Sequence, residues 1–482
     1  MKTIATLCLC FFTYSAHAEL PASVADALKQ SRIPQANVGV YVQAVDDASP
    51  TLMHNAEMGL NPASVMKLIT TNAALDLLSP AYRWKTEIYR DGDVVNGVLD
   101  GNLIIKGYGA PSFKAQDFWQ LLMRLQQAGI NEIKGDLIID KSIFAEKSGN
   151  RPAFDAEIWR AYNAQSSAFL VDRRRTSFRF SAADTTVNVN QEFELKEVQI
   201  VNNVQLSQGA CGDWRNRFAY TVKTKPDGAI VTFNGTFSPD CGERYLELSV
   251  LDDEQYAFYT FKKLWRELGG VFNGKLQNQD LPEQQDLSKR QDLSTQNLKS
   301  PAIKVIEQMS EPLGYVIRDM NKWSNNLTAR QLLLTLAAEK QVLPATEAKG
   351  ATVIKNWLAS KNIYAKEFVL ENGSGLSRIG RVSSQHLGQM LVSAYNSPVM
   401  PELLASLPIL GLDGTAQNRL KDGAAQNRVH LKTGSLDGVS ALAGYVLSSQ
   451  NKRYVFVFIV NHANAAASRT AQDALIEWVY SH

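Results

Sequence analysis

The two ends of this chain carry the same kind of structural pattern, and the long stretch between them carries a different one. Residues 37–45 alternate as a β-strand, and a helical pattern begins at about Val65. Near the other end, residues 429–461 contain three strand patterns joined by tight connections, which predict an antiparallel meander, and an amphipathic helix follows. We therefore expect both ends to build one α/β domain, with everything between about residues 85 and 299 inserted into it.

The insertion changes character along its length. Residues 85–184 and 252–299 mix strand and helix patterns, which predicts an α/β unit, whereas the short alternating strands of residues 185–251 predict a small all-β module. A chain of 482 residues exceeds one ordinary core. We therefore predict a multi-domain α/β protein, in which residues 19–84 and 300–482 form an antiparallel sheet flanked by helices and carry the α/β insertion with its nested β module.

Two predictions concern the end of the insertion. Residues 277–299 are rich in Gln, Asp, Leu and Ser and repeat Gln-Asp-Leu-Ser at positions 285–288 and 291–294. That composition is typical of a solvated surface loop. Beyond Pro301 we expect a helix over residues 302–309.

The first 18 residues have the pattern of a secretory signal peptide. Lys2 supplies the positive start, residues 4–14 are mostly apolar, and Ala16-His17-Ala18 is a small-x-small cleavage site. The apolar stretch is too short for a permanent membrane anchor. We therefore expect an exported periplasmic protein without a transmembrane anchor that begins near Glu19; an uncleaved anchor is the alternative.

Cysteine use agrees with export. Cys8 and Cys10 leave with the signal peptide, so only Cys211 and Cys241 remain, both inside the expected β module. Two cysteines in an oxidising compartment most simply form one disulfide, and a pair of buried free thiols is the alternative.

Charge and histidine spacing exclude two classes of partner. A net charge of +2 without a dense Lys/Arg stripe argues against nucleic acid. His54, His386, His430 and His462 lack the spacing of metal ligands, so no metal and no other cofactor are predicted.

Ser64 and Lys67 form the first chemically suggestive pair. Three residues apart at the start of a helix, they share one face, so the lysine amine can reach the serine hydroxyl. An amine kept neutral by burial or by a second cation can take the hydroxyl proton and make serine a nucleophile. Alone the motif is weak, since Ser449 and Lys452 form a second copy in a polar turn.

Two further motifs follow in chain order. Ser324-Asn325-Asn326 gives Ser-x-Asn before a helix, and Lys432-Thr433-Gly434 gives Lys-Thr-Gly on a strand. Ser-x-x-Lys followed by these two motifs is the signature of penicillin-binding proteins and class A β-lactamases.

Each motif has a chemical role in that scheme. Ser324 and Lys432 can relay a proton to a leaving amine, and Asn326 can bind a substrate amide or orient the lysine base. The hydroxyls of Thr433 and Ser435 share one strand face and could hold a terminal carboxylate, while Gly434 permits close approach. A peptide could pair along this strand at a sheet edge.

The whole chain after the signal resembles the class C low-molecular-mass penicillin-binding proteins, the D-Ala-D-Ala carboxypeptidase/endopeptidase family. The resemblance rests on the wide separation of Ser64 from Ser324 and on the stretches at residues 321–326 and 372–378. It implies that Ser64 is acylated and Lys67 is the base. Ser324 and Asn326 match the second motif of the family, and Lys432, Thr433 and Gly434 match the third. By the same resemblance, the N–H groups of Ser64 and Ser435 would form the oxyanion hole.

Less specific features of the resemblance concern substrate selection. Family members that process diaminopimelate-containing peptidoglycan place an acidic side chain of the insertion over the site; here Glu157 is the first candidate and Asp155 the second. Arg378 could help to hold the substrate, or could form a structural ion pair.

The predicted function is hydrolysis of peptidoglycan peptides through a serine acyl-enzyme, as a D-Ala-D-Ala carboxypeptidase and endopeptidase. Expected partners are peptidoglycan peptides and β-lactam antibiotics, with homo-oligomers possible. The alternatives are a β-lactamase or transpeptidase on the same residues, or a non-catalytic cell-wall-binding protein.

Overall fold

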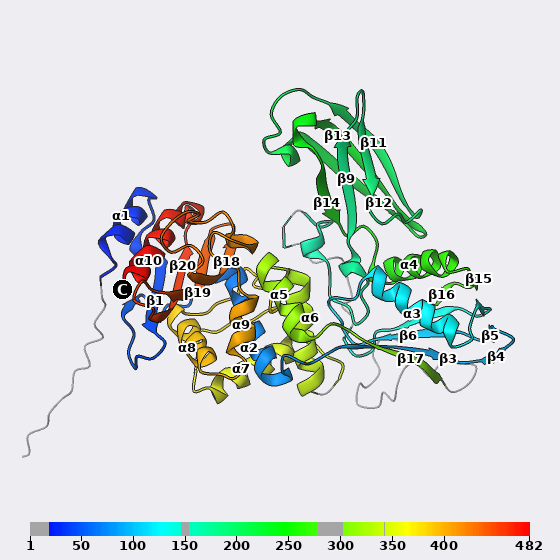
Figure 1. Cartoon of the computed structure of the whole chain (residues 1–482), viewed down its shortest axis with the longest axis horizontal. Coiled ribbons are helices and arrows are strands. Elements are labelled where there is room, and N and C mark those ends of the chain that lie inside the picture. The colour runs from blue at the N-terminus through cyan, green and yellow to red at the C-terminus, as the bar shows by residue number, and fades with distance from the viewer. Residues whose placement is uncertain (1–18, 146–153, 156, 278–301, 342) are drawn as a thin grey trace, which may run out of the picture.

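The structure is a computed structural model that describes residues 19–145, 154–155, 157–277, 302–341 and 343–482. The predicted signal peptide and nearly all of the predicted surface loop at 277–299 lie outside the described residues. In Figure 1, helices and a sheet built from both chain ends occupy one side, and the inserted sheets occupy the other. We call these parts the terminal unit and the insertion; the β module stands above the helix layer of the insertion.

The terminal unit is built on one antiparallel sheet with the strand order β18-β19-β20-β1-β2. Its first and last strands along the chain pair directly, because β1 lies between β20 and β2. The predicted mixed α/β fold with an antiparallel sheet is therefore present. The strands are β1 (Val38–Ala44), β2 (Leu52–His54), β18 (Val429–Leu436), β19 (Val439–Leu447) and β20 (Arg453–Asn461).

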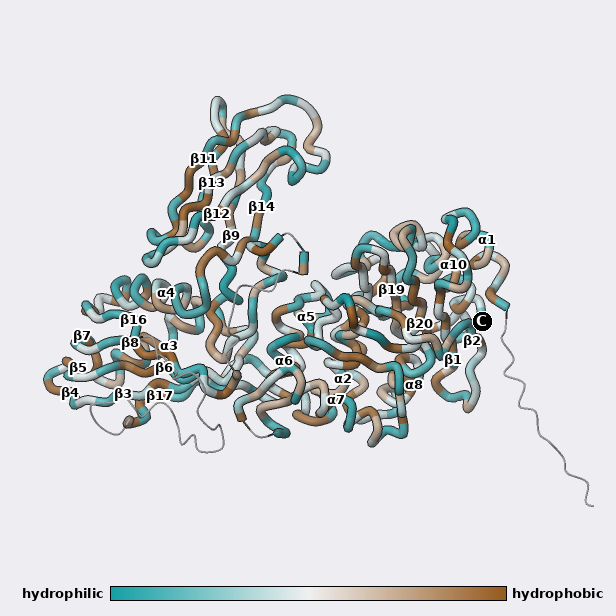
Figure 2. The backbone as a smooth tube through the Cα atoms, turned by 180° about the vertical axis from the view of Figure 1, so that it is seen from behind, coloured by the Kyte–Doolittle hydropathy of each residue, from teal (hydrophilic) through white to brown (hydrophobic). Residues whose placement is uncertain are grey.

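Helices cover both faces of this sheet. Val38, Val40 and Val42 point into a core shared with α1 and α10, whereas Tyr41 points into the core of the helices around α2. Figure 2 shows hydrophobic stretches where β19 and β20 run through the interior. The helices are α1 (Ala22–Gln30), α2 (Lys67–Leu78), α5 (Leu313–Trp323), α6 (Asn326–Lys340), α7 (Glu347–Ser360), α8 (Ser384–Tyr395), α9 (Met400–Ser406) and α10 (Arg469–Ser481).

α2 is the central helix of this unit. Every residue from Lys67 to Leu75 is buried, because α5, α6, α7, α8 and α9 all contact it. A helix enclosed on all sides needs no polar face, so its buried polar groups must find partners inside the protein.

The insertion contains a five-stranded sheet, β16-β8-β6-β3-β17, and a four-stranded sheet, β15-β7-β5-β4. The helices α3 (Ala115–Gln127) and α4 (Asp253–Glu267) pack against each other beside them. The strands are β3 (Lys85–Arg90), β4 (Asp93–Val95), β5 (Val98–Asp100), β6 (Leu103–Gly107), β7 (Glu132–Ile133), β8 (Leu137–Asp140), β15 (Val271–Phe272), β16 (Leu276–Gln277) and β17 (Ile303–Met309).

The predicted helix at residues 302–309 is wrong. These residues form β17, which pairs antiparallel with β3 and buries Ile306 against the core. The strand satisfies its backbone by pairing with residues far away in the sequence, which a local pattern cannot reveal. Residues 303–309 therefore belong to a sheet of the insertion, whereas the sequence pattern predicts that the second part of the terminal unit starts at residue 300.

The β module consists of two three-stranded sheets, β10-β9-β14 and β11-β13-β12. β9 already belongs to it, so the module begins before residue 185. Phe180 packs against Phe233 and Trp214 between the sheets. The strands are β9 (Thr176–Ala182), β10 (Val187–Gln191), β11 (Val198–Leu206), β12 (Phe218–Lys225), β13 (Gly228–Phe237) and β14 (Arg244–Leu248).

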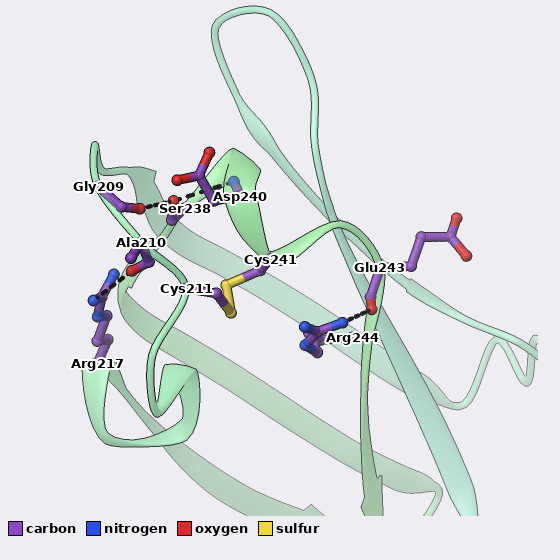
Figure 3. Close-up of a disulfide and its surroundings, with 9 residues drawn as sticks. All are labelled: Gly209, Ala210, Cys211, Arg217, Ser238, Asp240, Cys241, Glu243 and Arg244. Carbon is purple, nitrogen blue, oxygen red and sulfur yellow. Dashed lines mark hydrogen bonds between the residues drawn. A yellow bond between two sulfur atoms is a disulfide. The ribbon is translucent and has the colours of Figure 1, made fainter.

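The predicted disulfide between Cys211 and Cys241 is present (Figure 3). It joins two loops of the module, and the Cα atoms of the two cysteines lie 4.6 Å apart. Ser238 and Gly209 hydrogen-bond beside it, so the same two loops are also linked by their polar groups.

Among the helices of the described ranges, none combines the length and the apolar character needed to cross a bilayer.

Candidate active site

Ser64 lies in a short 3-10 turn, Ala63–Met66, that leads directly into α2. Ala63 before it has a φ of 46°, a left-handed conformation that is uncommon for alanine. Asn61 holds this turn: its side-chain oxygen accepts from the Ala63 N–H at 2.9 Å, and its amide donates to the Ser377 carbonyl at 2.8 Å. Ser64 is therefore presented by a turn that other segments fix in place.

The Lys67 amine is completely buried and has three neighbours. Nζ lies 2.9 Å from Ser64 Oγ, 2.7 Å from Asn326 Oδ1 and 2.6 Å from the carbonyl oxygen of Ser374. The last two oxygens can only accept hydrogen bonds. A neutral amine has two N–H groups and one lone pair, so it can donate to both and turn its lone pair toward the Ser64 hydroxyl. This geometry suits Lys67 to accept the serine proton.

The turn between α5 and α6 carries the second motif. Ser324 ends α5 in the left-handed conformation, with a φ of 59°. Asn325 begins α6 as its N-cap, because its side-chain oxygen accepts from the Thr328 N–H at 2.9 Å. This arrangement turns Ser324 toward Lys432 and Asn326 toward Lys67.

Lys432 is also completely buried, and its amine donates to Ser324 Oγ at 3.0 Å and to the Thr433 carbonyl at 2.9 Å. Burial lowers the pKa of Lys432 to about 7. The pKa of Lys67 lies well below its ordinary value, first because of burial and then because the positive charges of Lys432 and Arg330 act on it. Each charge therefore favours the neutral form of Lys67.

The strand β18 forms one edge of the sheet and has an open half. In its first half, the Leu431 N–H donates outward to the Pro408 carbonyl at 2.9 Å. Since alternate residues of a strand point their N–H groups the same way, the N–H groups of Thr433 and Ser435 also point to the outer edge. A Cβ on Gly434 would lie 2.6 Å from the Pro62 carbonyl, so glycine lets one face of β18 lie against the Ser64 turn.

The three motifs therefore meet in one place. Lys67 contacts Ser64 and Asn326, and Lys432 contacts Ser324. Within the third motif, the Thr433 hydroxyl donates to the Thr415 hydroxyl at 2.8 Å.

The weaker candidates lie in the surrounding segments. Arg378 is exposed; it donates to the Asp437 carbonyl at 3.3 Å and lies 4.4 Å from the ring centroid of Phe154, a residue of the insertion. Asp155 accepts hydrogen bonds from Tyr162 and Asn163, each at 2.9 Å. Glu157 instead accepts from Tyr220 of the β module at 2.8 Å.

Sequence reasoning missed several contributors to this site. The Ser374 carbonyl, Asn61, Arg330 and Thr415 were not singled out for any role. Only the glycine-rich stretch at 372–378 offered a signal. Gly375, with a φ of 78°, packs so closely on Ala63 that a Cβ would collide with the Ala63 carbonyl. That close packing brings the neighbouring Ser374 carbonyl to Lys67.

Comparisons with known proteins agree over nearly the whole chain. A model of the D-Ala-D-Ala carboxypeptidase 3 (S13) family matches residues 20–481. D-alanyl-D-alanine carboxypeptidase DacB of Haemophilus influenzae is 25% identical over 459 residues, which are 93% of this chain and 90% of that protein. The D-alanyl-D-alanine carboxypeptidase of Actinomadura sp. is 25% identical over 470 residues, 95% of this chain and 84% of that protein.

A solved structure confirms the fold. The crystal structure of penicillin binding protein 4 from Haemophilus influenzae superimposes with a TM-score of 0.76 at 24% identity and covers 95% of this chain and 99% of that chain. The predicted penicillin-binding fold is therefore present.

We predict that Gly375→Ala lowers the free energy of unfolding of the terminal unit by about 3 kcal/mol or more, because it combines backbone strain with a collision at Ala63. The matched control is Gly438→Ala, where φ is 74° but the nearest other atom lies 3.9 Å from the added Cβ. It should cost only about 1–2 kcal/mol. Denaturant unfolding monitors both, and equal losses would contradict the collision.

Proposed function

The chain belongs to the D-Ala-D-Ala carboxypeptidase 3 (S13) family of serine hydrolases, and on this premise we propose that it hydrolyses peptidoglycan peptides through an acyl-enzyme on Ser64. The observation that carries the proposal is the contact of the buried Lys67 amine with Ser64, Asn326 and the Ser374 carbonyl. Its named relatives are D-alanyl-D-alanine carboxypeptidases.

In the proposed reaction, neutral Lys67 takes the Ser64 proton while Oγ attacks the carbonyl carbon of the peptide bond before a terminal D-Ala. The N–H groups of Ser64 and Ser435 hold the oxyanion. The proton that Lys67 has taken reaches the leaving amine through Lys432 and Ser324, which releases D-Ala and returns Lys67 to its neutral form. Water then attacks the ester while Lys67 takes a proton from it, and that proton passes to Ser64 Oγ as the acid product leaves.

Substrate binding is proposed along β18. The outward N–H groups of its open half could pair with an extended peptide, and the hydroxyls of Thr433 and Ser435 could bind the terminal carboxylate. A crosslinked peptide has the same type of bond, so endopeptidase action is proposed with carboxypeptidase action. Since the substrate lies in the cell wall, we propose a periplasmic location, in line with the signal-like pattern of residues 1–18.

β-Lactams are proposed to acylate Ser64 as substrate mimics. A related crystal structure, penicillin binding protein 4 of Haemophilus influenzae at 23% identity, is described as complexed with a β-lactam.

The proposed function is tested with fluorescent penicillin and a pentapeptide ending in D-Ala-D-Ala. Ser64→Ala should abolish labelling and lower D-Ala release by about four orders of magnitude or more, because the nucleophile is gone. The matched control is Ser449→Ala, the exposed serine of the second Ser-x-x-Lys, which should change neither.

Other outcomes have clear meanings. Release that survives Ser64→Ala would refute the proposal. Labelling of the wild-type protein without D-Ala release would favour a binding protein, and rapid penicillin turnover a β-lactamase.

The rate of acylation should follow a bell-shaped pH profile, with an acid limb set by Lys67 and a basic limb set by Lys432. It should rise with pH as Lys67 loses its proton and fall above about pH 7 as Lys432 loses the proton that the relay through Ser324 needs. Arg330→Gln removes one positive charge that acts on Lys67, so the pKa of Lys67 should rise and the acid limb should move to higher pH.

Penicillin acylation rates across pH check this prediction. The basic limb should stay in place, because burial alone lowers the pKa of Lys432. Arg419→Gln, which removes a buried arginine paired with Asp473 elsewhere in the protein, serves as the control and should move neither limb. An acid limb that does not respond to Arg330→Gln would contradict the role of that charge.

Diaminopimelate recognition is proposed for Asp155 rather than Glu157. Both carboxylates accept hydrogen bonds, but Asp155 follows Phe154, on which Arg378 packs, whereas Glu157 is directed to Tyr220 of the β module. Asp155→Asn should raise KM about tenfold for a diaminopimelate peptide but not for the same peptide without the side-chain amine. Glu157→Gln is the matched control, and turnover unchanged in both variants would end the hypothesis.

A further inference from the structure

A cavity of about 200 Å³ lies directly beside the second motif. Its wall on the terminal unit is the turn at residues 323–327, and its wall on the insertion includes Arg160, Arg173, Arg175 and Glu247. We call it the arginine pocket. Ser324 and Asn326 line it and also contact the two buried lysines, so the pocket adjoins the catalytic centre without belonging to it.

The pocket carries an excess of positive charge. Arg175 pairs with Glu247 at 2.7 Å, and Arg173 pairs at 2.5 Å with Asp319 of α5. Within the described part of the chain, Arg160 has no acidic partner; its guanidinium lies 5.8 Å from the ring centroid of Tyr162. With Asp319 counted, three guanidiniums are matched by two carboxylates, so the excess is one positive charge, and it lies on Arg160.

The backbone holds one of these arginines at a cost. Asp172, Arg173 and Arg174 are consecutive residues with φ of 47°, 57° and 57°, a left-handed turn built without glycine. Both flanks of the turn are anchored: Asp172 accepts from the Ala115 N–H at 3.2 Å, and buried Arg174 donates to the Leu251 carbonyl at 2.9 Å. Arg173 between them is thereby directed to the pocket wall.

We propose that the arginine pocket binds a carboxylate of the peptide substrate that lies on the N-terminal side of the scissile bond; this inference rests on the proposed function. A guanidinium presents a planar pair of donors that matches a carboxylate. The terminal carboxylate is assigned to Thr433 and Ser435, but no β18 residue lines the pocket. The pocket therefore serves a second anionic group, and we place that group on the acyl side of Ser64 because Asn326, which can bind the substrate amide, lines the pocket.

The test uses two peptides ending in D-Ala-D-Ala that differ at one group. One carries a free carboxylate N-terminal to the scissile bond, and the other carries a carboxamide there. The wild-type protein should show a KM about tenfold lower for the carboxylate peptide. Arg160→Gln and Arg175→Gln should each remove most of that preference by raising KM for the carboxylate peptide alone, with kcat unchanged.

A matched control exists on the same face of the β module. Arg179 pairs with Glu243 at 3.2 Å, and the two side chains are 43% and 53% exposed, close to the 42% and 46% of Arg175 and Glu247. Arg179 lies outside the pocket, so Arg179→Gln should leave the preference intact.

Three results would overturn the inference. Equal KM values for the two peptides with the wild-type protein would do so, and so would pocket variants that raise both KM values alike, which indicates a structural role. If the wild-type protein releases D-Ala from neither peptide, the proposed function fails and the inference fails with it; release without preference refutes the pocket alone.

Discussion

The complete burial of the Lys67 amine is the constraint on which the rest of this structure depends. Removing an amine from water costs free energy unless its N–H groups and its lone pair find hydrogen-bond partners inside the protein. Its three partners come from three segments: the turn before α2, the start of α6 and the glycine-rich stretch at 372–378. The same desolvation that costs folding free energy lowers the pKa of Lys67 and favours its neutral form, which the proposed activation of Ser64 requires.

The insertion is coupled to this centre through α6. Gln331 of α6 is fully buried and donates to the carbonyls of Gly109 and Ser167, while its own side-chain oxygen accepts from the Ser167 N–H. Asn326, which contacts Lys67, stands at the start of the same helix. The loops of the insertion therefore contact the same helix, α6, that positions Asn326 beside Lys67.

Much of the site could be predicted from the sequence because its chemistry uses side chains at fixed local spacing. Ser64 and Lys67 lie one helical turn apart, and the other two motifs also carry reactive side chains. The Ser374 contact could not be predicted, since it uses a backbone carbonyl that any residue offers. The sequence predicts a helix at β17 for a related reason. Its partner β3 lies far away in the sequence, and only one of the seven residues of β17, Ile306, is buried, so the local pattern carries little strand signal.

The partly covered edge of β18 has a consequence for solubility as well as for catalysis. An unpaired strand edge invites strands of other molecules, and long flat edges cause aggregation. Here the bridge between Ile409 and His430 occupies the first half of β18, so the residues that the structure describes leave only its short remainder, in contact with the Ser64 turn, unpaired. An unpaired stretch of this length suits a few residues of an extended peptide better than a full strand of a neighbouring sheet, which limits stacking with other copies of the molecule.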